Sequence, residues 1–314
     1  MQFLEGQVPA LVAEYEQRGP AELGPGTVSL RWQVQQLLSE HQPLQLRWRL
    51  HRVASQLAAL LAYMAVNTGR FGLADAYCRE ALHLATETED VDLQMWVSGT
   101  ESLGAYYQGN YLRAQSCAAE GRSLSPSNPQ AIRLLVNGEA RALGQLGDRG
   151  GANTAIGKAL ALLERHEIGP ELTPCISFLP YGYARLAANA ATAYVGLGDT
   201  EQVLRYTDDV DPAVERAESA WSRALVRLDI ATALLRQADT DLEQAVSIGQ
   251  EALDVCGDHP IRSVVQRAVT LHALTQHFGD DGRAAEFDEA FRAWCARPEV
   301  VEIAERAPTR CRTR

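Results

Sequence analysis

The stretch SLGAYYQGNYLRAQSCAAEGRSLSP at residues 102–126 decides the fold. Its apolar residues recur at helical spacing on both sides of Gly109, and Pro126 ends the second segment. The small residues Gly104 and Ala114 allow two helices to approach closely, and glycine at position 109 permits a tight turn. The stretch therefore predicts a hairpin of two antiparallel helices.

Similar hairpins recur along the chain at a period of about 40 residues. Their turns are expected at Gly69, Gly109, Gly147, Gly198, Ala238 and Gly279. One step is longer because it holds an insertion, Glu167–Tyr181, whose prolines predict an irregular loop. A recurring helical hairpin predicts an all-α fold, a right-handed superhelical solenoid of antiparallel helix pairs.

The expected domain organisation has three parts. Residues 1–45 form an N-terminal helical cap, residues 46–296 form an array of about five to six helix pairs, and residues 297–314 form a flexible tail. In the cap, a helix over 1–24 is expected to stop at Gly19-Pro20, with a turn over 24–30 and a second helix over Arg31–Glu40. The array is expected to open with a long helix, Leu44–Thr68.

Composition limits the classes of function. The chain has 29 Lys and Arg against 40 Asp and Glu, a net charge of −11, which disfavours direct nucleic-acid binding. No apolar run is long enough to span a membrane, and the N-terminus is too acidic for a signal peptide. These features predict a cytoplasmic protein without membrane association.

No residues stand out for chemistry. The six cysteines lack metal-binding spacing, and no two histidines pair at i,i+4, so no metal and no cofactor are predicted. The segment at 147–159 ends in Gly157-Lys158 but has alanine where a phosphate-binding loop needs serine or threonine. No pair of carboxylates has a spacing that suits acid–base work, so no catalytic residue is predicted and the chain is not expected to be an enzyme.

A ligand site is expected on the concave face of the array, which the first helix of each pair lines in such solenoids. Asparagine side chains can donate to and accept from one peptide unit, arginines can pair with a terminal carboxylate, and aromatic rings can form apolar walls. Counting back from each turn selects Tyr63, Asn67, Trp96, Tyr106, Asn137, Arg141, Arg185, Asn189, Asp229 and Arg236. Alternatively, Asn67 only ends its helix and Tyr106 only packs within the hairpin.

The repeats resemble the tetratricopeptide repeat. The resemblance rests on Leu103-Gly104, Tyr106, Gly109, Asn110-Tyr111, Ala114 and Pro126, on GRFGLADAYCREALHL at 69–84, and on the Ala-Leu pairs at 81–82, 159–160 and 252–253. It covers about residues 46–295 and implies a helical binding module.

An opening acidic helix is followed by the long helix Arg47–Thr68, by GRFGLADAYCREALHLA at 69–85, and by a helix over Leu93–Tyr107 that contains Trp96 and leads into the turn Tyr106–Ala114. In this layout the chain also resembles the C-terminal portion of actinobacterial Xre-type helix-turn-helix regulators, without the helix-turn-helix. That resemblance implies a module that senses a peptide or small molecule in transcriptional regulation. Two other functions remain open: a protein-interaction scaffold without a small ligand, and an enzyme that uses the groove as a substrate pocket. A homodimer through the first helices or through residues 284–294 is also plausible.

Overall fold

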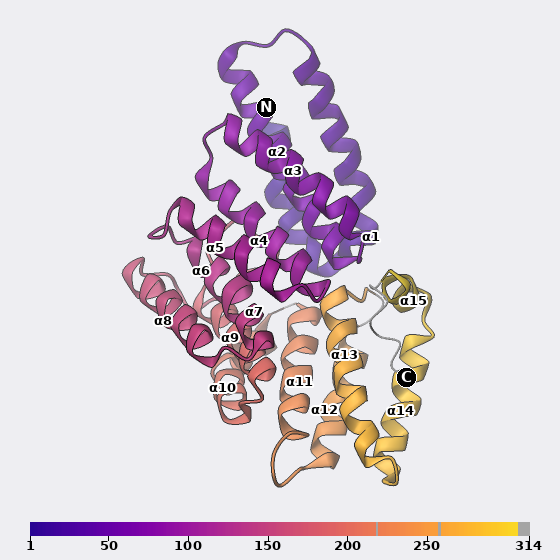
Figure 1. The fold of residues 1–314 in the computed structure, drawn as a ribbon. Helices are drawn as coiled ribbons and strands as arrows, with labels where there is room; N and C mark the ends of the chain where they lie inside the picture. Colours follow the sequence, from indigo (N-terminus) through magenta and orange to yellow (C-terminus); the bar gives the residue numbers. More distant parts are fainter. Residues whose placement is uncertain (218, 257–258, 307–314) are drawn as a thin grey trace.

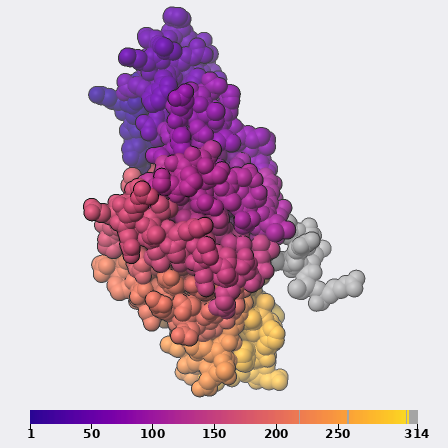
Figure 2. Space-filling model, turned by 60° about the vertical axis from the view of Figure 1, so that its left-hand side comes forward, coloured from indigo at the N-terminus to yellow at the C-terminus, as the bar shows by residue number. Residues whose placement is uncertain are grey.

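The computed structural model describes residues 1–217, 219–256 and 259–306, and every regular element in these ranges is a helix. The chain is an all-α solenoid of antiparallel helix pairs, as the sequence predicts (Figure 1). Its space-filling surface runs from the N-terminal helices at one end to the C-terminal repeats at the other (Figure 2).

In the part of the chain that the structure describes, six helix pairs follow the N-terminal helix α1 (Gln2–Ser39). The pairs are α2 (Leu44–Asn67) with α3 (Phe71–Glu87), α4 (Val91–Tyr107) with α5 (Tyr111–Leu124), the composite helix α6 (Ala131–Arg133), η1 (Leu134–Ala140) and α7 (Arg141–Leu146) with α8 (Arg149–Arg165), α9 (Tyr183–Leu197) with α10 (Thr200–Arg216), α11 (Ala220–Leu234) with α12 (Leu242–Val255), and α13 (Arg262–Thr275) and η2 (Gln276–Phe278) with α14 (Gly282–Cys295). Helix α15 (Pro298–Glu305) follows them.

Four of the expected turns use glycine in the left-handed region. Gly69, Gly109, Gly147 and Gly198 have φ of 72°, 75°, 78° and 66°. A side chain would be strained there, and the next helix starts at once. After Gly109, for example, the Asn110 side chain accepts a hydrogen bond from the backbone N–H of Arg113, which caps α5. The last turn differs, because Gly279 has φ of −57°.

The expected turn over residues 24–30 is wrong, because this segment is helical within α1. The chain bends earlier, at Gly19, whose φ of 76° and ψ of 168° interrupt the helix. Pro20 starts the second half of α1, where a missing N–H costs little. The glycines and proline at 24–30 predict a turn, but the helix is interrupted at Gly19 instead.

The expected flexible tail over 297–314 is also wrong in part. Residues Pro298–Glu305 form α15, whose Val300 and Ile303 are buried. Residues 307–314 lie outside the described residues. The division into cap, array and tail remains a prediction.

The N-terminal helices also contact the C-terminal part of the chain. The rings of Tyr15 in α1 and Trp221 in α11 pack edge to face with centroids 5.3 Å apart, and the Trp221 indole N–H donates to the carbonyl of His259 at 2.6 Å. At the other end of the chain, Arg306 donates to the carbonyl of Thr68 at 3.4 Å. Trp221 also lines the space along the axis of the solenoid.

The insertion at 167–181 is irregular, as predicted, and runs into that axial space. The indole N–H of Trp96 donates to the carbonyl of Ser177 at 2.7 Å, and the rings of Trp96 and Phe178 lie 4.7 Å apart. The backbone N–H of Cys175 donates to Glu16 of α1 at 2.7 Å. The insertion loop therefore becomes part of the inner wall.

None of the helices in the described ranges has the length and apolar character needed to cross a membrane.

Candidate functional site

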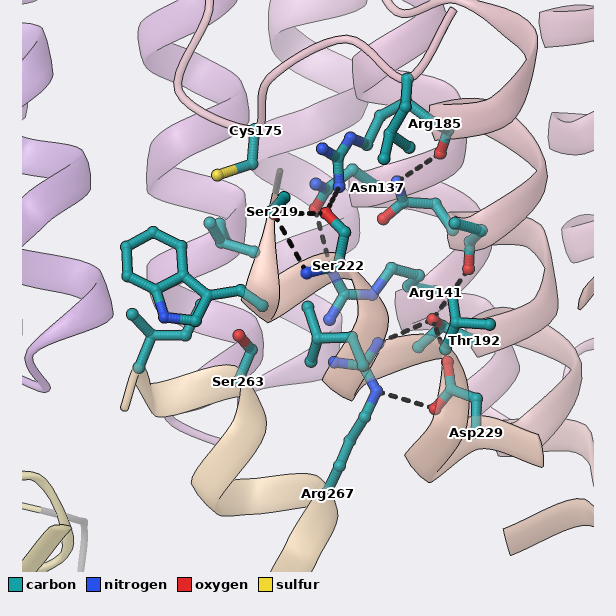
Figure 3. Close-up of a pocket in the computed structure, with 18 of the residues that line it drawn as sticks. Asn137, Arg141, Cys175, Arg185, Thr192, Ser219, Ser222, Asp229, Ser263 and Arg267 are labelled. Carbon is teal, nitrogen blue, oxygen red and sulfur yellow. Dashed lines mark hydrogen bonds and ion pairs between the residues drawn. The ribbon is translucent and has the colours of Figure 1, made fainter. Parts of the chain in front are cut away.

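The axial space contains a cavity lined by both polar and apolar side chains, which we call the axial pocket. Its volume is ≈ 60 Å³. Side chains reach it from first helices of five pairs, α2, α4, α9, α11 and α13, from η1 and α7, from the C-terminal half of α10, and from the insertion loop (Figure 3). It is lined by Tyr63, Asn67, Leu103, Tyr107, Asn137, Arg141, Leu172, Cys175, Tyr181, Arg185, Ala188, Asn189, Thr192, Val214, Ser219, Trp221, Ser222, Leu225, Val226, Asp229, Ile261, Ser263 and Arg267.

A π-helical segment carries one wall of the axial pocket. Residues Leu134–Ala140 form η1, and Arg141 begins α7 directly after it. Single π-helical turns are rare and frequently lie at functional sites. Gly138 allows η1 to lie against α5, because a Cβ there would sit 2.4 Å from the Cβ of Ala118. The segment brings Asn137 and Arg141 into the same cavity.

Arg141 has neutral neighbours. One guanidinium nitrogen donates to Asn137 Oδ1 at 3.1 Å and another donates to the hydroxyl of Tyr107 at 3.2 Å. The guanidinium also lies over the ring of Tyr106, 4.3 Å from its centroid. The side chain is 3% exposed, and its Nε has no hydrogen-bond partner.

Arg185 in α9 contacts the insertion loop, α11 and α1. Its Nε donates to the carbonyl of Thr173 at 2.7 Å, and Nη1 donates to Ser222 Oγ at 3.1 Å. Its Nη2 lies 3.6 Å from a carboxylate oxygen of Glu16. Burial opposes ionisation of Glu16. The charge of Arg185 and the hydrogen bonds that the Glu16 carboxylate accepts nevertheless hold the pKa of Glu16 below its ordinary value.

The buried Asp229 and the partly buried Arg267 form an ion pair on the opposite wall (Figure 3). Arg267 Nε donates to Asp229 Oδ1 at 2.7 Å. Thr192 joins the pair, because its hydroxyl donates to Asp229 at 2.8 Å and accepts from Arg267 at 2.7 Å. This three-residue contact joins α9, α11 and α13.

A second hollow of ≈ 150 Å³, the side hollow, adjoins the axial pocket. The two share six wall residues: Tyr107, Arg141, Thr192, Asp229, Ser263 and Arg267. Tyr106 and Arg236 line only the side hollow. The residues around Arg141 and Arg267 therefore lie between the two spaces.

Burial and two cations act in opposite directions on Tyr107. Burial of the phenol raises its pKa, whereas Arg141 and Arg267, with hydrogen bonds from Arg141 and Ser263, lower it. The cations and hydrogen bonds outweigh burial, so the pKa of Tyr107 lies below its ordinary value. Arg141 and Arg267 therefore favour the ionised form of Tyr107.

The structure brings together most of the residues predicted from the sequence. Seven line the axial pocket: Tyr63, Asn67, Asn137, Arg141, Arg185, Asn189 and Asp229. All three of their amides already have protein partners, since Asn67 donates to the Tyr15 hydroxyl at 2.7 Å, Asn137 donates to the Tyr181 hydroxyl at 3.2 Å and Asn189 donates to the carbonyl of Arg185 at 2.7 Å. Whether any of them touches a ligand stays a prediction.

Three predicted wall residues lie outside the axial pocket. Trp96 is 1% exposed and packs between Tyr63, Phe178 and Arg133, so it is absent from both cavity walls. Tyr106 and Arg236 line the side hollow instead of the axial pocket. Trp96 is covered because the insertion loop lies over it, and the sequence gives no sign of that path.

Sequence reasoning missed Arg267 and the residues of the insertion loop. Arg267 lies on the first helix of the last pair and would have been found by counting back from Gly279, as for the other turns. Leu172, Cys175 and Tyr181 come from the insertion loop, where no helical period indicates direction.

A larger hollow of ≈ 570 Å³ lies beside α15. Its floor is apolar, with Leu61, Met64 and Ile303, and its rim carries Arg70 and Glu302. Glu302 pairs with Arg70 at 3.4 Å and with Arg306, which also lines the hollow. Among the described residues, no group of three or more histidines, cysteines or carboxylates could hold a metal ion. The axial pocket is thus the better candidate site, because buried polar side chains converge on it.

Comparison with known proteins supports the fold. Neither the protein-family models nor the curated proteins include a match to this chain. Among solved structures, the chain is similar to a Rap protein in complex with Competence and Sporulation Factor, with a TM-score of 0.60 and 11% sequence identity. The match covers 97% of this chain and 77% of the Rap chain. At this identity the similarity shows a shared tetratricopeptide-like fold.

Proposed function

We propose that this protein is a binding module that senses a peptide or a small molecule in its axial pocket. The observation that carries the proposal is the convergence of buried polar side chains from most of the helix pairs on one cavity. Burying such groups costs free energy unless they gain partners, so their collection at one place indicates selection for a ligand. The Rap structure supports it, since that similar fold was solved with a bound factor.

The cavity of ≈ 60 Å³ holds only the end group of a peptide. A longer ligand extends into the side hollow of ≈ 150 Å³, and the insertion loop moves to admit it. Typical ligand pockets measure roughly 300–1,000 Å³, so binding is expected to widen this one.

A thermal-shift screen against synthetic peptides and cell extract tests the proposal. A ligand at 100 times its Kd stabilises the protein by about 2.7 kcal/mol, which raises the melting temperature. The double variant Asn137→Ala, Arg141→Ala should keep its helicity and lose the shift. Lys158→Gln, on the exposed face of α8, is the matched control and should keep it. A shift that survives the double variant would place the ligand elsewhere.

The regulatory role is a finer part of the proposal. The resemblance to Xre-type regulators supports a role in transcription, exerted through a partner, because a net charge of −11 disfavours DNA binding by this chain. Fluorescence anisotropy with DNA duplexes should show no binding by the chain alone. Tight, sequence-specific binding would contradict that part.

The alternative is a protein-interaction scaffold without a small ligand, and one observation favours it. Large apolar side chains near the α1–α2 connection are exposed: Trp32 by 60%, Leu44 by 83% and Trp48 by 46%. Such side chains are typical of protein contacts. Pull-down should then capture a protein partner, or light scattering should show a homodimer, and the double variant Trp32→Ser, Trp48→Ser should lose that interaction. This result, together with no thermal shift in any extract, would favour the scaffold.

A further inference from the structure

The charges of the axial pocket do not balance. Three arginines and one aspartate line it: Arg141, Arg185, Arg267 and Asp229. Asp229 pairs with Arg267 at 2.7 Å, and Glu16, from behind the wall, pairs with Arg185 at 3.6 Å. Among the described residues no carboxylate lies within ion-pair distance of Arg141. The excess positive charge is therefore one, and it lies on Arg141.

A buried guanidinium without an anion is costly. Arg141 is 3% exposed, and its contacts with Asn137, Tyr107 and Tyr106 are with neutral groups. Its Nε, a donor that cannot be removed by deprotonation, has no partner. A charged group in a protein interior is normally paired with an opposite charge.

The space beside Arg141 suits a small anion. The residue borders both the axial pocket and the side hollow, so a group bound to it can continue into either space. A volume of ≈ 60 Å³ accommodates a carboxylate and the atoms next to it. One excess positive charge matches a carboxylate, whereas a phosphate dianion would leave the site negative.

We propose that Arg141 binds a carboxylate of the ligand at the junction of the axial pocket and the side hollow. This inference rests on the proposed ligand binding and names the chemistry of the ligand. The carboxylate is the free C-terminus of a peptide or an acidic side chain within it. Arg141 binds it through the unpartnered Nε and the neighbouring nitrogen, which is the geometry that guanidinium groups offer to carboxylates. Asn137 holds Arg141 in place from the previous turn.

Arg133 provides the matched control. It is also buried, at 2% exposed, and has no carboxylate partner in the described part of the chain. It stacks on Trp96, 4.2 Å from the ring, and lines neither cavity. Arg133→Gln and Arg141→Gln therefore remove the same charge from the same stretch of chain, but only the second faces ligand space.

The test is affinity selection from a synthetic library of N-acetylated tripeptides, each present as a free acid and as a C-terminal amide, with retained members identified by mass. The full chain should retain acids over their matched amides by roughly tenfold or more, as a charge-assisted hydrogen bond predicts. Amides should be retained only where they contain aspartate or glutamate, which separates the two sources of the carboxylate.

The variants decide the assignment. Arg141→Gln should reduce the ratio of acid to amide to about one, Arg141→Lys should keep part of it, and Arg133→Gln should leave it unchanged. Equal retention of acids and neutral amides by the unaltered chain would overturn the carboxylate anchor and leave peptide binding standing. Retention of nothing would contradict peptide binding itself.

A second measurement does not depend on the library. Millimolar N-acetylglycine should raise the melting temperature of the unaltered chain and of Arg133→Gln, and N-acetylglycinamide should not. Arg141→Gln, checked for helicity by circular dichroism, should respond to neither. An equal response of Arg141→Gln to N-acetylglycine, or no response of the unaltered chain, would overturn the anchor.

Discussion

Arg133 and Arg141 lie at the two ends of the π-helical segment and are both buried without a carboxylate partner in the described part of the chain. Their surroundings differ. Arg133 lies over the Trp96 ring and donates to Thr100 at 3.0 Å, within the packed core, whereas Arg141 borders two cavities. The difference shows that burial alone does not mark a functional arginine. A candidate binding arginine is one that is both buried and in contact with a cavity.

The largest expected effect separates the two arginines by stability. Arg133→Ala removes a desolvated cation–π contact and leaves a cavity, so we expect the free energy of unfolding to fall by about 3 kcal/mol. Arg141→Ala should cost less, about 1 kcal/mol, because its side chain borders two cavities. Urea denaturation of both variants measures the difference. Arg133→Met, which keeps the volume and removes the charge, should stay within about 1 kcal/mol of the unaltered chain.

Equal losses in Arg133→Ala and Arg141→Ala would show that the pocket is packed as tightly as the core. The assignment of Arg141 to ligand space would then lose its main support.

The next largest effect concerns the ion pair between Asp229 and Arg267 in the wall of the axial pocket. Asp229→Asn leaves Arg267 without its buried partner, and we expect a loss of about 2 kcal/mol in the free energy of unfolding. A double-mutant cycle with Arg267→Gln should give a coupling energy of about 1–3 kcal/mol. Coupling near zero would mean that the pair is no more than an exposed contact.

Particular residues show how far the sequence could predict this structure. The turns at Gly69, Gly109, Gly147 and Gly198 were predictable, because each needs a left-handed residue that ends one helix before a new one starts. Helix period also predicted that Asn137 and Arg185 face inward, since position within a first helix sets the direction of a side chain.

Long-range packing could not be predicted in the same way. The path of the insertion loop over Trp96 depends on contacts with α1 and α4, and no local period encodes it. The missing counter-ion of Arg141 depends on which carboxylates fold near it, which is a property of the assembled walls. Local pattern therefore predicted the scaffold and seven of the residues that line the axial pocket, and tertiary contacts determined which of them remain unpaired.

A glycine change should move a pocket wall without altering a pocket residue. A Cβ at Gly144 in α7 would lie 2.3 Å from the carbonyl oxygen of Ala193 in α9, so Gly144→Ala must push these helices apart. We expect a loss of about 1–2 kcal/mol in the free energy of unfolding. Gly157→Ala in α8, where nothing lies within 4 Å, is the control and should be neutral or stabilising by up to about 1 kcal/mol. Similar melting temperatures for the two variants would contradict close packing of α7 on α9.

The smallest effect is a titration that distinguishes the two arginines without a ligand. The pKa of Tyr107 is lowered, despite burial, chiefly by Arg141, so Arg141→Gln should raise it and Arg133→Gln should leave it unchanged. Because the folded pKa lies below the unfolded one, ionisation of Tyr107 adds stability as pH rises from the folded pKa towards the ordinary value, and this stability is lost as pH falls. Phenolate absorbance against pH measures the shift, with Tyr107→Phe to assign the signal. A phenol that titrates alike in both arginine variants would show that Arg141 does not set the potential at the junction of the two cavities.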